Sequence, residues 1–280
     1  MAETVRRAFV CGHPVAHSRS PLIHNYWLRR LGLSGTYERI DVPPEEFGIF
    51  VRDFSRMGFV GGNVTLPHKE AAFSLVSEVD AAARLIGAVN TLWLEEGMLH
   101  GTNTDAPGFL ANLDDQAPQW RRARAAIVVG AGGAARAILY ALKESGMDNI
   151  KIVNRTLARA VDLAKRFAPG PTAHGWDELP LLLKETDLLV NTTSLGMEDT
   201  SGSDFDLAAL PRHAVVTDIV YVPLETPLLR EARLHGLATV DGLGMLLYQA
   251  VPGFTRWFGR KPEVTEELRK LVIADLETTK

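Results

Sequence analysis

Side chains suited to binding a polar ligand and to moving a proton stand at several places in the first 105 residues. Ser18 and Ser20 lie at the start of a helical pattern that begins with Pro21, where hydroxyls and free helix N–H groups can bind an anion together. The same position also suits ordinary N-capping by Ser20. Thr65 and Lys69 follow an apolar run, so they lie where a strand of an α/β sheet would end and where such sheets bind ligands.

Two further strings, Gly87–Thr91 and Gly101–Asp105, place Asn90 and Asp105 beside predicted strands. Their side chains offer hydrogen-bonding groups, and a lysine among such groups can act as a general acid or base. Taken alone, Lys69 has the ordinary interpretation of a solvated charge, and Asn90 and Asp105 carry little weight.

The string Val129-Gly-Ala-Gly-Gly-Ala-Ala135 connects an apolar run to a helical pattern and predicts a dinucleotide-binding turn. Gly130 permits the tight turn, Gly132 lets the backbone approach a pyrophosphate, and Ala135 lets the helix pack close to the strand. The helix start offers N–H groups and a positive dipole end to the phosphates. A purely structural glycine turn is the alternative. The expected cofactor contacts in this string are Gly130, Ala131, Gly132, Gly133, Ala134 and Ala135.

The next apolar run ends at Asn154, Arg155 and Thr156, with Arg159 one turn later. Sites selective for NAD usually place Asp or Glu here to bind the ribose 2′-hydroxyl. An acidic side chain would repel the 2′-phosphate of NADP, whereas arginine and threonine can donate hydrogen bonds to it. The sequence therefore predicts NADP as the cofactor. The alternative is that both arginines are surface charges.

Composition argues against several other functions. The sequence has no Tyr-x-x-x-Lys pair: Tyr140 and Lys143 are only three residues apart and lie inside the predicted cofactor helix. A single cysteine, Cys11, excludes internal disulfides and cysteine-rich metal sites. His13 and His17 have a proline between them, so no metal site is predicted. A formal net charge of −4 argues against nucleic acid as a partner. Without a membrane-length apolar run or a signal peptide, the sequence predicts a cytoplasmic protein and no membrane partner.

Short apolar runs alternate with helical patterns, which predicts an α/β fold of two lobes, with a mostly parallel central sheet. A polar, irregular stretch at 112–124 marks a break. We expect an N-terminal substrate-binding lobe of residues 1–105, to which 245–280 return, and a Rossmann-like NADP-binding lobe of residues 106–244, with the reaction in the cleft between them. The expected strands are 7–12, 37–42, 59–64, 91–94, 98–100, 125–129, 149–153, 187–191 and 214–218, and the expected helices are 21–31, 44–57, 156–167, 226–234 and 262–276.

Taken in order, the strings resemble the shikimate dehydrogenase family over nearly the whole chain, from Gly12 to Ala250. Each string is short, but the ordered set is highly specific. The strings that carry the resemblance are His17–Pro21, Asn63–Lys69, Gly87–Thr91, Thr102–Asp105, Gly130–Ala135, Asn191–Met197 and Asp241–Ala250.

The resemblance implies reversible reduction of 3-dehydroshikimate to shikimate with NADPH, in chorismate and aromatic amino-acid biosynthesis. It implies that Lys69 shuttles the proton at the C3 oxygen and is paired with Asp105. Ile219, which stands where many members of the family have Met, would line the cofactor, as would Gly242 and Asn154–Arg159. The implied substrate contacts are Ser18 and Ser20 for the carboxylate, with Tyr221 nearby, and Thr65, Asn90, Asp105 and Gln249 for the ring hydroxyls.

Two other functions stay open at this point. A quinate or quinate/shikimate dehydrogenase would have to accommodate an extra C1 hydroxyl near the serines and often has an acidic residue near Asn154. The serine pair and Arg155 favour shikimate and NADP instead. A non-catalytic, dinucleotide-sensing protein would need no proton shuttle, so the presence of Lys69 together with Asp105 argues against it. The sequence leaves the oligomeric state open, with a homodimer as one alternative.

Overall fold

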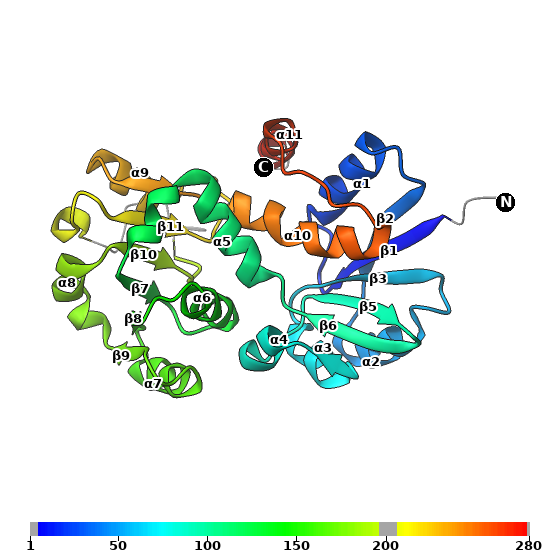
Figure 1. Ribbon diagram of the computed structural model, residues 1–280, viewed down its shortest axis with the longest axis horizontal. Coiled ribbons are helices and arrows are strands. Elements are labelled where there is room, and N and C mark those ends of the chain that lie inside the picture. Colours follow the sequence, from blue (N-terminus) through cyan, green and yellow to red (C-terminus); the bar gives the residue numbers. More distant parts are fainter. Residues whose placement is uncertain (1–4, 196–205, 279–280) are drawn as a thin grey trace. The chain divides into compact units, whose positions relative to one another are not determined.

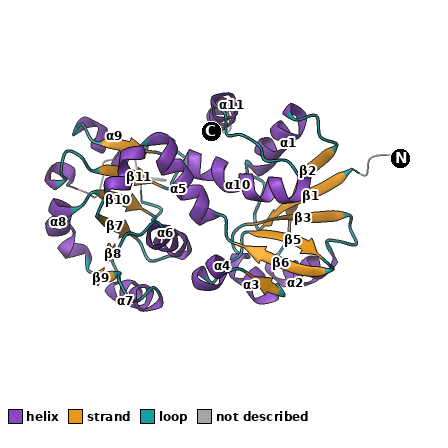
Figure 2. Cartoon of the chain, in the orientation of Figure 1, coloured by secondary structure: helices purple, strands orange, loops and turns teal. Residues whose placement is uncertain are grey.

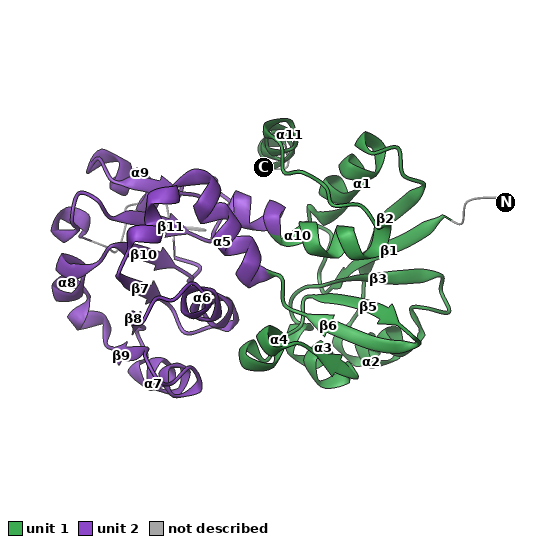
Figure 3. Cartoon of the chain, in the orientation of Figure 1, with its two compact units in different colours: residues 1–104, 249–280 green, residues 105–248 purple. Residues whose placement is uncertain are grey.

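The computed structural model describes residues 5–195 and 206–278. The chain forms two compact units (Figure 3), which are residues 1–104 with 249–280 and residues 105–248. Each unit is built around its own six-stranded sheet. Gly196 and Met197, which end one of the strings that carry the resemblance, lie outside the described residues.

Unit 1 contains a mixed sheet with the strand order β2-β1-β3-β5-β6-β4 (Figure 1). Its strands pair in parallel except for β5, which runs antiparallel to both β3 and β6. The elements of this unit are β1 (Arg6–Gly12), α1 (Ser20–Arg30), β2 (Gly35–Asp41), α2 (Pro44–Asp53), β3 (Phe59–Val64), α3 (Lys69–Leu75), β4 (Glu78–Val79), α4 (Ala81–Ile86), β5 (Thr91–Glu95), β6 (Met98–Thr102), the end of α10 (Leu243–Phe258) and α11 (Glu266–Thr278).

Two aromatic cores cover the faces of the unit 1 sheet, whose helices lie on both sides (Figure 2). Phe9 of β1 contacts Phe50, Phe54 and Phe59 edge-on, at ring-centroid distances of 5.0, 5.4 and 5.3 Å. Such edge contacts between aromatic rings add to the stabilisation from burial itself. This first core also contains Cys11, which is fully buried.

The second core of unit 1 explains why the chain returns to this unit after residue 248. The rings of His24 and Tyr37 stack with their centroids 3.9 Å apart, and the ring centroid of Phe254 in α10 lies 5.9 Å from that of His24. Trp257 donates its indole N–H to the carbonyl of Leu92, at 2.9 Å. Because Phe254 and Trp257 are buried among these residues, the second half of α10 packs in unit 1.

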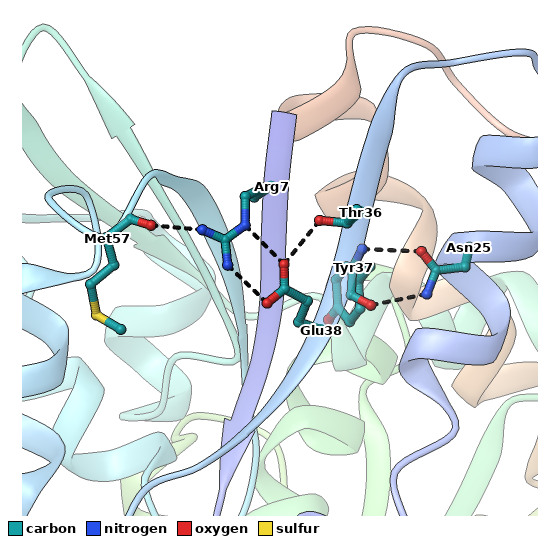
Figure 4. Close-up of polar contacts among 6 residues, drawn as sticks. All are labelled: Arg7, Asn25, Thr36, Tyr37, Glu38 and Met57. Carbon is teal, nitrogen blue, oxygen red and sulfur yellow. Dashed lines mark hydrogen bonds and ion pairs between the residues drawn. The ribbon is translucent and has the colours of Figure 1, made fainter. Parts of the chain in front are cut away.

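Side chains also tie β1, β2 and α1 together (Figure 4). Arg7 donates two hydrogen bonds to the carboxylate of Glu38, both 2.9 Å, and a third to the carbonyl of Met57. The amide of Asn25 donates to the carbonyl of Tyr37 at 2.9 Å and accepts its N–H at 3.1 Å. Because β2 is an edge strand, Asn25 satisfies backbone groups that would otherwise have no strand partner, and it fixes α1 against the sheet.

Unit 2 contains a fully parallel sheet with the order β12-β11-β10-β7-β8-β9. Counted within the unit this is 6-5-4-1-2-3, the doubly wound order that binds dinucleotides at the point where the strand order reverses. The elements are α5 (Asp105–Gln116), η1 (Pro118–Arg122), β7 (Ala125–Val129), α6 (Gly133–Glu144), β8 (Asn149–Val153), α7 (Leu157–Arg166), β9 (Thr172–His174), η2 (Trp176–Glu178), α8 (Leu179–Leu182), η3 (Leu183–Glu185), β10 (Leu188–Asn191), η4 (Leu207–Ala209), β11 (Val215–Asp218), α9 (Pro227–Leu234), β12 (Ala238–Val240) and the start of α10.

The α/β class with mostly parallel sheets is confirmed, but some predicted elements are wrong. The stretch 112–124 is not irregular, because α5 extends to Gln116 and η1 follows it. The sequence pattern hid this helix because one of its buried residues is polar: Asn112 donates to the carbonyl of Asp241 at 2.7 Å. The last helix begins at Glu266 instead of residue 262, and α2 ends at Asp53 instead of residue 57. Within the described part of the chain, no helix is long and apolar enough to cross a membrane.

The glycine pair of β3 provides a test of this packing. A Cβ atom added at Gly62 would overlap the ring of Phe9, whereas one added at Gly48 in α2 would meet nothing within 4 Å. We expect Gly62→Ala to lower the free energy of unfolding by about 1–3 kcal/mol through overpacking. Gly48→Ala, the matched control, should raise it by about 0.5–1 kcal/mol because alanine favours the helix. Urea unfolding of the two variants measures both changes, and equal effects would contradict the described packing around Phe9.

Candidate functional site

The polar residues predicted in unit 1 gather at one edge of its sheet. Strands β1, β3 and β6 end at this edge, and β5 begins there because it runs in the opposite direction. Asn63 of β3 is paired with Thr91 of β5, and Thr91 is paired with Thr102 of β6. The segments that carry Ser18 and Ser20, Thr65 and Lys69, and Asn90 therefore all leave the sheet on the same side.

The turn after β1 that carries Ser18 and Ser20, called the serine turn below, is held by two arginines. Arg39 donates to the carbonyl of Ser18 at 2.9 Å, and Arg19 donates to the carbonyl of His17. Arg19 also forms an ion pair with Asp275 of α11, at 2.9 Å, and its side chain is only 12% exposed. The backbone of the turn is thus fixed from two sides of unit 1.

Ser20 does not act as the N-cap of α1, which corrects one of the two sequence-based alternatives. It is the first helical residue, and Arg19 occupies the N-cap position without a capping side-chain hydrogen bond. The helix start is stabilised instead by Pro21 and by the hydroxyl of Ser18, which accepts the N–H of Ser20 at 3.4 Å. The side chain of Ser20 therefore has no capping role.

The loop that carries Thr65 and Lys69 is fixed by backbone and ring contacts. The N–H of Thr65 donates to the carbonyl of Cys11 at 2.9 Å, and Val89 donates its N–H to the carbonyl of Lys69 at 2.9 Å. His68, between them, is buried; its ring stacks on Phe47 at 4.3 Å and bonds the carbonyl of Val42 at 2.7 Å. The loop is therefore held on both sides of the half-buried residues Thr65 and Lys69.

Asn90 stands at the centre of a buried hydrogen-bond network. Its side-chain oxygen accepts from the hydroxyl of Thr91 at 2.9 Å and from the N–H and hydroxyl of Thr104 at 2.9 and 3.1 Å. The hydroxyl of Thr104 also lies 3.5 Å from the amide oxygen of Gln249, in α10. The structure thus brings Asn90 and Gln249, predicted from distant strings, into one network.

Sequence reasoning missed Tyr37, which extends this network. Its buried hydroxyl donates to Asn63 at 2.5 Å, and Asn63 donates in turn to the carbonyl of Asn90 and the hydroxyl of Thr91, at 3.0 and 3.1 Å. Burial raises the pKa of Tyr37 well above its usual value, and a hydrogen bond with Ser20 is among the contacts that oppose the shift. A strand tyrosine gives no local signal that its hydroxyl will be buried among polar groups.

His24 packs beside Tyr37 without a hydrogen-bond partner for either ring nitrogen. Burial lowers its pKa to about 3, and the nearby amide of Asn63 opposes only part of that shift. A neutral imidazole can stack on aromatic rings, whereas its cation would be buried without a counter-charge. His24 therefore serves this edge as a packing residue and carries no charge at neutral pH.

In unit 2, the glycine string forms the predicted turn between β7 and α6. Gly130 has a φ of +110°, and a Cβ atom there would lie 2.5 Å from the hydroxyl of Thr192, so only glycine fits. A Cβ atom at Gly132 would meet no protein atom within 4 Å. The protein itself therefore leaves open space beside this backbone, as a close approach by pyrophosphate requires. Ala135 is fully buried and lets α6 pack against the sheet.

The end of β8 presents the side chains predicted to select NADP. The amide of Asn154 donates to the carbonyl of Thr156 at 2.8 Å, and this fixes the start of α7. The side chains of Arg155 and Arg159 are exposed, and the guanidinium of Arg155 lies 5.6 Å from the ring of Trp176. The segment carries no carboxylate from Asn154 to Arg159, so its charge suits a 2′-phosphate.

The end of β11 contains a buried carboxylate that sequence reasoning also missed. Asp218 is fully buried and accepts hydrogen bonds from the side chain of Asn191, the N–H of Val220 and the hydroxyl of Thr226, at 3.1, 3.0 and 2.8 Å. Burial raises its pKa to about 6, although the hydrogen bonds oppose the shift. The backbone of Ile219 and Val220 packs against Gly242, where a Cβ atom would overlap both carbonyl oxygens.

The predicted substrate contacts fall in both units. Ser18, Ser20, Thr65, Lys69, Asn90 and Gln249 belong to unit 1. Asp105, the first residue of α5, and Tyr221, after β11, belong to unit 2. The pairing of Lys69 with Asp105 stays a prediction. Among residues 5–195 and 206–278, no group of three or more His, Cys, Asp or Glu side chains is arranged to hold a metal ion.

Three family models match the chain. They are the shikimate dehydrogenase substrate binding domain at residues 10–92, shikimate / quinate 5-dehydrogenase at residues 113–219, and the shikimate 5′-dehydrogenase C-terminal domain at residues 242–272. A curated protein from Chelativorans sp. (strain BNC1), named shikimate dehydrogenase (NADP(+)), is 59% identical over 280 residues, which cover 100% of each chain.

Solved structures of related enzymes share the fold. Shikimate 5-dehydrogenase from Thermus thermophilus, in complex with NADP(H) and shikimate, is 39% identical with a TM-score of 0.85, over 99% of this chain and 100% of that one. Quinate dehydrogenase from Corynebacterium glutamicum, in complex with NAD, is 30% identical with a TM-score of 0.88, over 96% and 99%. The fold is thus shared by proteins whose named substrates and cofactors differ.

The pKa of Asp218 predicts a pH-dependent contribution to stability. Between pH 4 and pH 6 the folded protein retains a proton that the unfolded chain has released, so this contribution is present below about pH 4 and is lost as pH rises through 6. Between pH 4 and pH 7, the free energy of unfolding of the wild type should fall by about 2 kcal/mol relative to Asp218→Asn. Urea unfolding at several pH values measures the difference. Asp162→Asn, at an exposed site, is the control, and a constant difference for Asp218→Asn would contradict the raised pKa.

Proposed function

The chain belongs to the shikimate dehydrogenase family, and we propose that it catalyses the reversible NADP-dependent reduction of 3-dehydroshikimate to shikimate, in the pathway to chorismate and the aromatic amino acids. One observation carries this proposal. Hydroxyl and amide side chains gather at the edge of the unit 1 sheet where the segment that carries Lys69 also leaves the sheet. This chemistry matches a small ring that carries several hydroxyls and one carboxylate.

Unit 1 binds the substrate in this proposal. Ser18 and Ser20 hold the carboxylate from the serine turn, which Arg19 and Arg39 stabilise, and Tyr221 of unit 2 assists them. The hydroxyls of the ring bind a second set of side chains: Thr65, Asn90, Asp105 and Gln249. The network of Asn90 supports this assignment because it fixes the side-chain oxygen of Asn90 before a ligand arrives. A ligand that left one of these groups unpaired would lose about 1–3 kcal/mol of binding free energy.

Lys69 transfers the proton. In the reduction it donates a proton to the C3 oxygen of 3-dehydroshikimate, which becomes the hydroxyl of shikimate, and in the oxidation it takes the proton back. NADPH, when bound, supplies the hydride that adds to the carbonyl carbon. Asp105 orients the ammonium group of Lys69. The fixed backbone of the loop from Thr65 to Lys69 supports this role, because a proton donor must be held within hydrogen-bond reach of the reacting oxygen.

Unit 2 binds NADP. The N-terminus of α6 and the open backbone at Gly132 receive the pyrophosphate, together with the rest of the string from Gly130 to Ala135. Asn154, Arg155, Thr156 and Arg159 bind the adenosine end and its 2′-phosphate. Ile219 and Gly242, on the other side of the reversal in strand order, line the nicotinamide half.

Initial rates with purified protein test the proposed activity. We expect nicotinamide absorbance to show a large preference for shikimate over quinate and for NADP+ over NAD+, because the serine turn and the end of β8 fit the first of each pair. Turnover of quinate, or a preference for NAD+, would place the protein with the quinate dehydrogenases and overturn the role given to Asn154–Arg159. No turnover with any pair would favour a dinucleotide-sensing protein.

Replacing the lysine tests the catalytic assignment. Lys69→Ala should lower kcat for shikimate by about 100- to 10,000-fold, which is the usual contribution of general acid–base catalysis. The dissociation constant of NADP+, measured by fluorescence titration, should stay the same because Lys69 belongs to unit 1. Lys261→Ala, which removes an exposed lysine of the same unit, is the matched control. Wild-type kcat in Lys69→Ala would remove Lys69 from the mechanism.

A further inference from the structure

We infer that Asp218 is a positioning residue: its buried carboxylate fixes the backbone from Ile219 to Tyr221 and thereby sets affinity for the nicotinamide half of NADP and for the substrate. This inference rests on the proposed function, which gives Ile219 a cofactor contact and Tyr221 a substrate contact. Asp218 itself touches neither ligand in this scheme.

The hydrogen bonds of Asp218 fix the loop after β11 at both ends. One carboxylate oxygen accepts the N–H of Val220 at 3.0 Å, which folds the chain back immediately after the strand. The other oxygen accepts the hydroxyl of Thr226 at 2.8 Å, and Thr226 caps the start of α9. The seven residues between Ile219 and Glu225 are therefore joined at both ends to one side chain, and Ile219 and Tyr221 lie at the start of this segment.

The neighbouring strand is fixed through the same carboxylate. Asn191, at the end of β10, donates its side-chain amide to Asp218 at 3.1 Å, and its carbonyl accepts the N–H of Ile219 at 3.2 Å. The side-chain oxygen of Asn191 accepts the N–H and the hydroxyl of Thr193, at 3.1 and 2.7 Å. A single network thus organises the chain that leaves β10 and the chain that leaves β11.

The position of this network in the sheet decides which half of the cofactor it affects. A doubly wound sheet binds the pyrophosphate where the strand order reverses, which here is between β7 and β10. The end of β8 lies on one side of that point and receives the adenosine end, so the ends of β10 and β11 lie on the nicotinamide side. Loss of the carboxylate should weaken contacts on that side and leave the adenosine end unchanged.

The burial of Asp218 argues for a specific role. Its three donors are neutral groups, and burying a carboxylate without a cation is costly. Burial raises its pKa to about 6, which records that cost. A neutral side chain at this position would avoid the cost but could not accept hydrogen bonds from all three donors at once.

The dissociation constants of two ligands, NADP+ and 2′,5′-ADP, test the inference independently of catalysis. In Asp218→Ala we expect the dissociation constant of NADP+ and the KM of shikimate to rise by about tenfold or more, because buried donors lose their acceptor. The dissociation constant of 2′,5′-ADP, which carries only the adenosine end and the 2′-phosphate, should stay within about twofold. Asp218→Asn retains an acceptor oxygen for Val220 and Asn191 and should restore most of the affinity for NADP+.

Two isosteric substitutions complete the experiment. Thr226→Val removes one of the three donors and should raise the same two constants by a smaller factor, which keeps the test valid if Asp218→Ala does not fold. Thr217→Val makes the same chemical change at the adjacent buried residue of β11 and should leave all constants unchanged. Equal weakening of NADP+ and 2′,5′-ADP, or unchanged binding of both in Asp218→Ala and Thr226→Val, would overturn the inference.

Failure of the proposed function would be recognised separately. If the wild type does not turn over shikimate, the proposed function fails, but the ratio of the NADP+ and 2′,5′-ADP dissociation constants still tests the role of Asp218. If the wild type is active and that ratio is the same in wild type and Asp218→Ala, only the inference about Asp218 fails.

Discussion

The hydrogen bonds of Asn90 hold together the polar edge of unit 1. Its oxygen accepts from residues on both neighbouring segments, Thr91 and Thr104, and its carbonyl accepts from Asn63. Polar groups buried this deeply must be paired, so the positions of the surrounding side chains depend on each other. Antiparallel β5 makes the arrangement possible, because its start lies beside the ends of β3 and β6. A fully parallel sheet would have placed Asn90 at the opposite edge.

In the proposed function, the two units bind their ligands with different kinds of group. Unit 1 would bind the hydroxylated ring with side chains, on segments held by buried residues such as Tyr37 and His68, because such a ring needs donors and acceptors at defined positions. Unit 2 would bind the pyrophosphate mainly with backbone at Gly130 and Gly132, because a pyrophosphate needs N–H groups and close approach. The quinate dehydrogenase that is 30% identical to this chain keeps the same fold although its named substrate differs.

Features that depend on neighbouring residues in the sequence were predictable, and those that depend on distant pairs were not. The turn at Gly130 and the class of the fold follow from local spacing and were predicted correctly. The helix that contains Asn112 was missed because a polar residue at a buried position interrupts the apolar pattern that predicts a helix. The partner of Asn112, Asp241, is far along the chain. The roles of Tyr37 and Asp218 could not be predicted either, since each depends on a partner that only the folded chain brings near.

Helix α10 begins in unit 2 and ends in unit 1 without a break. Within unit 1, Gln249 lies on this helix with Phe254 and Trp257, so their relative positions are set by about 1.5 Å of rise and about 100° of rotation per residue. Inserting or deleting one residue between Gln249 and Phe254 would turn Gln249 away from Thr104 or displace the buried side chains of Phe254 and Trp257. During divergence this segment can therefore exchange residues but cannot change length, and relatives that keep both contacts should align here without gaps.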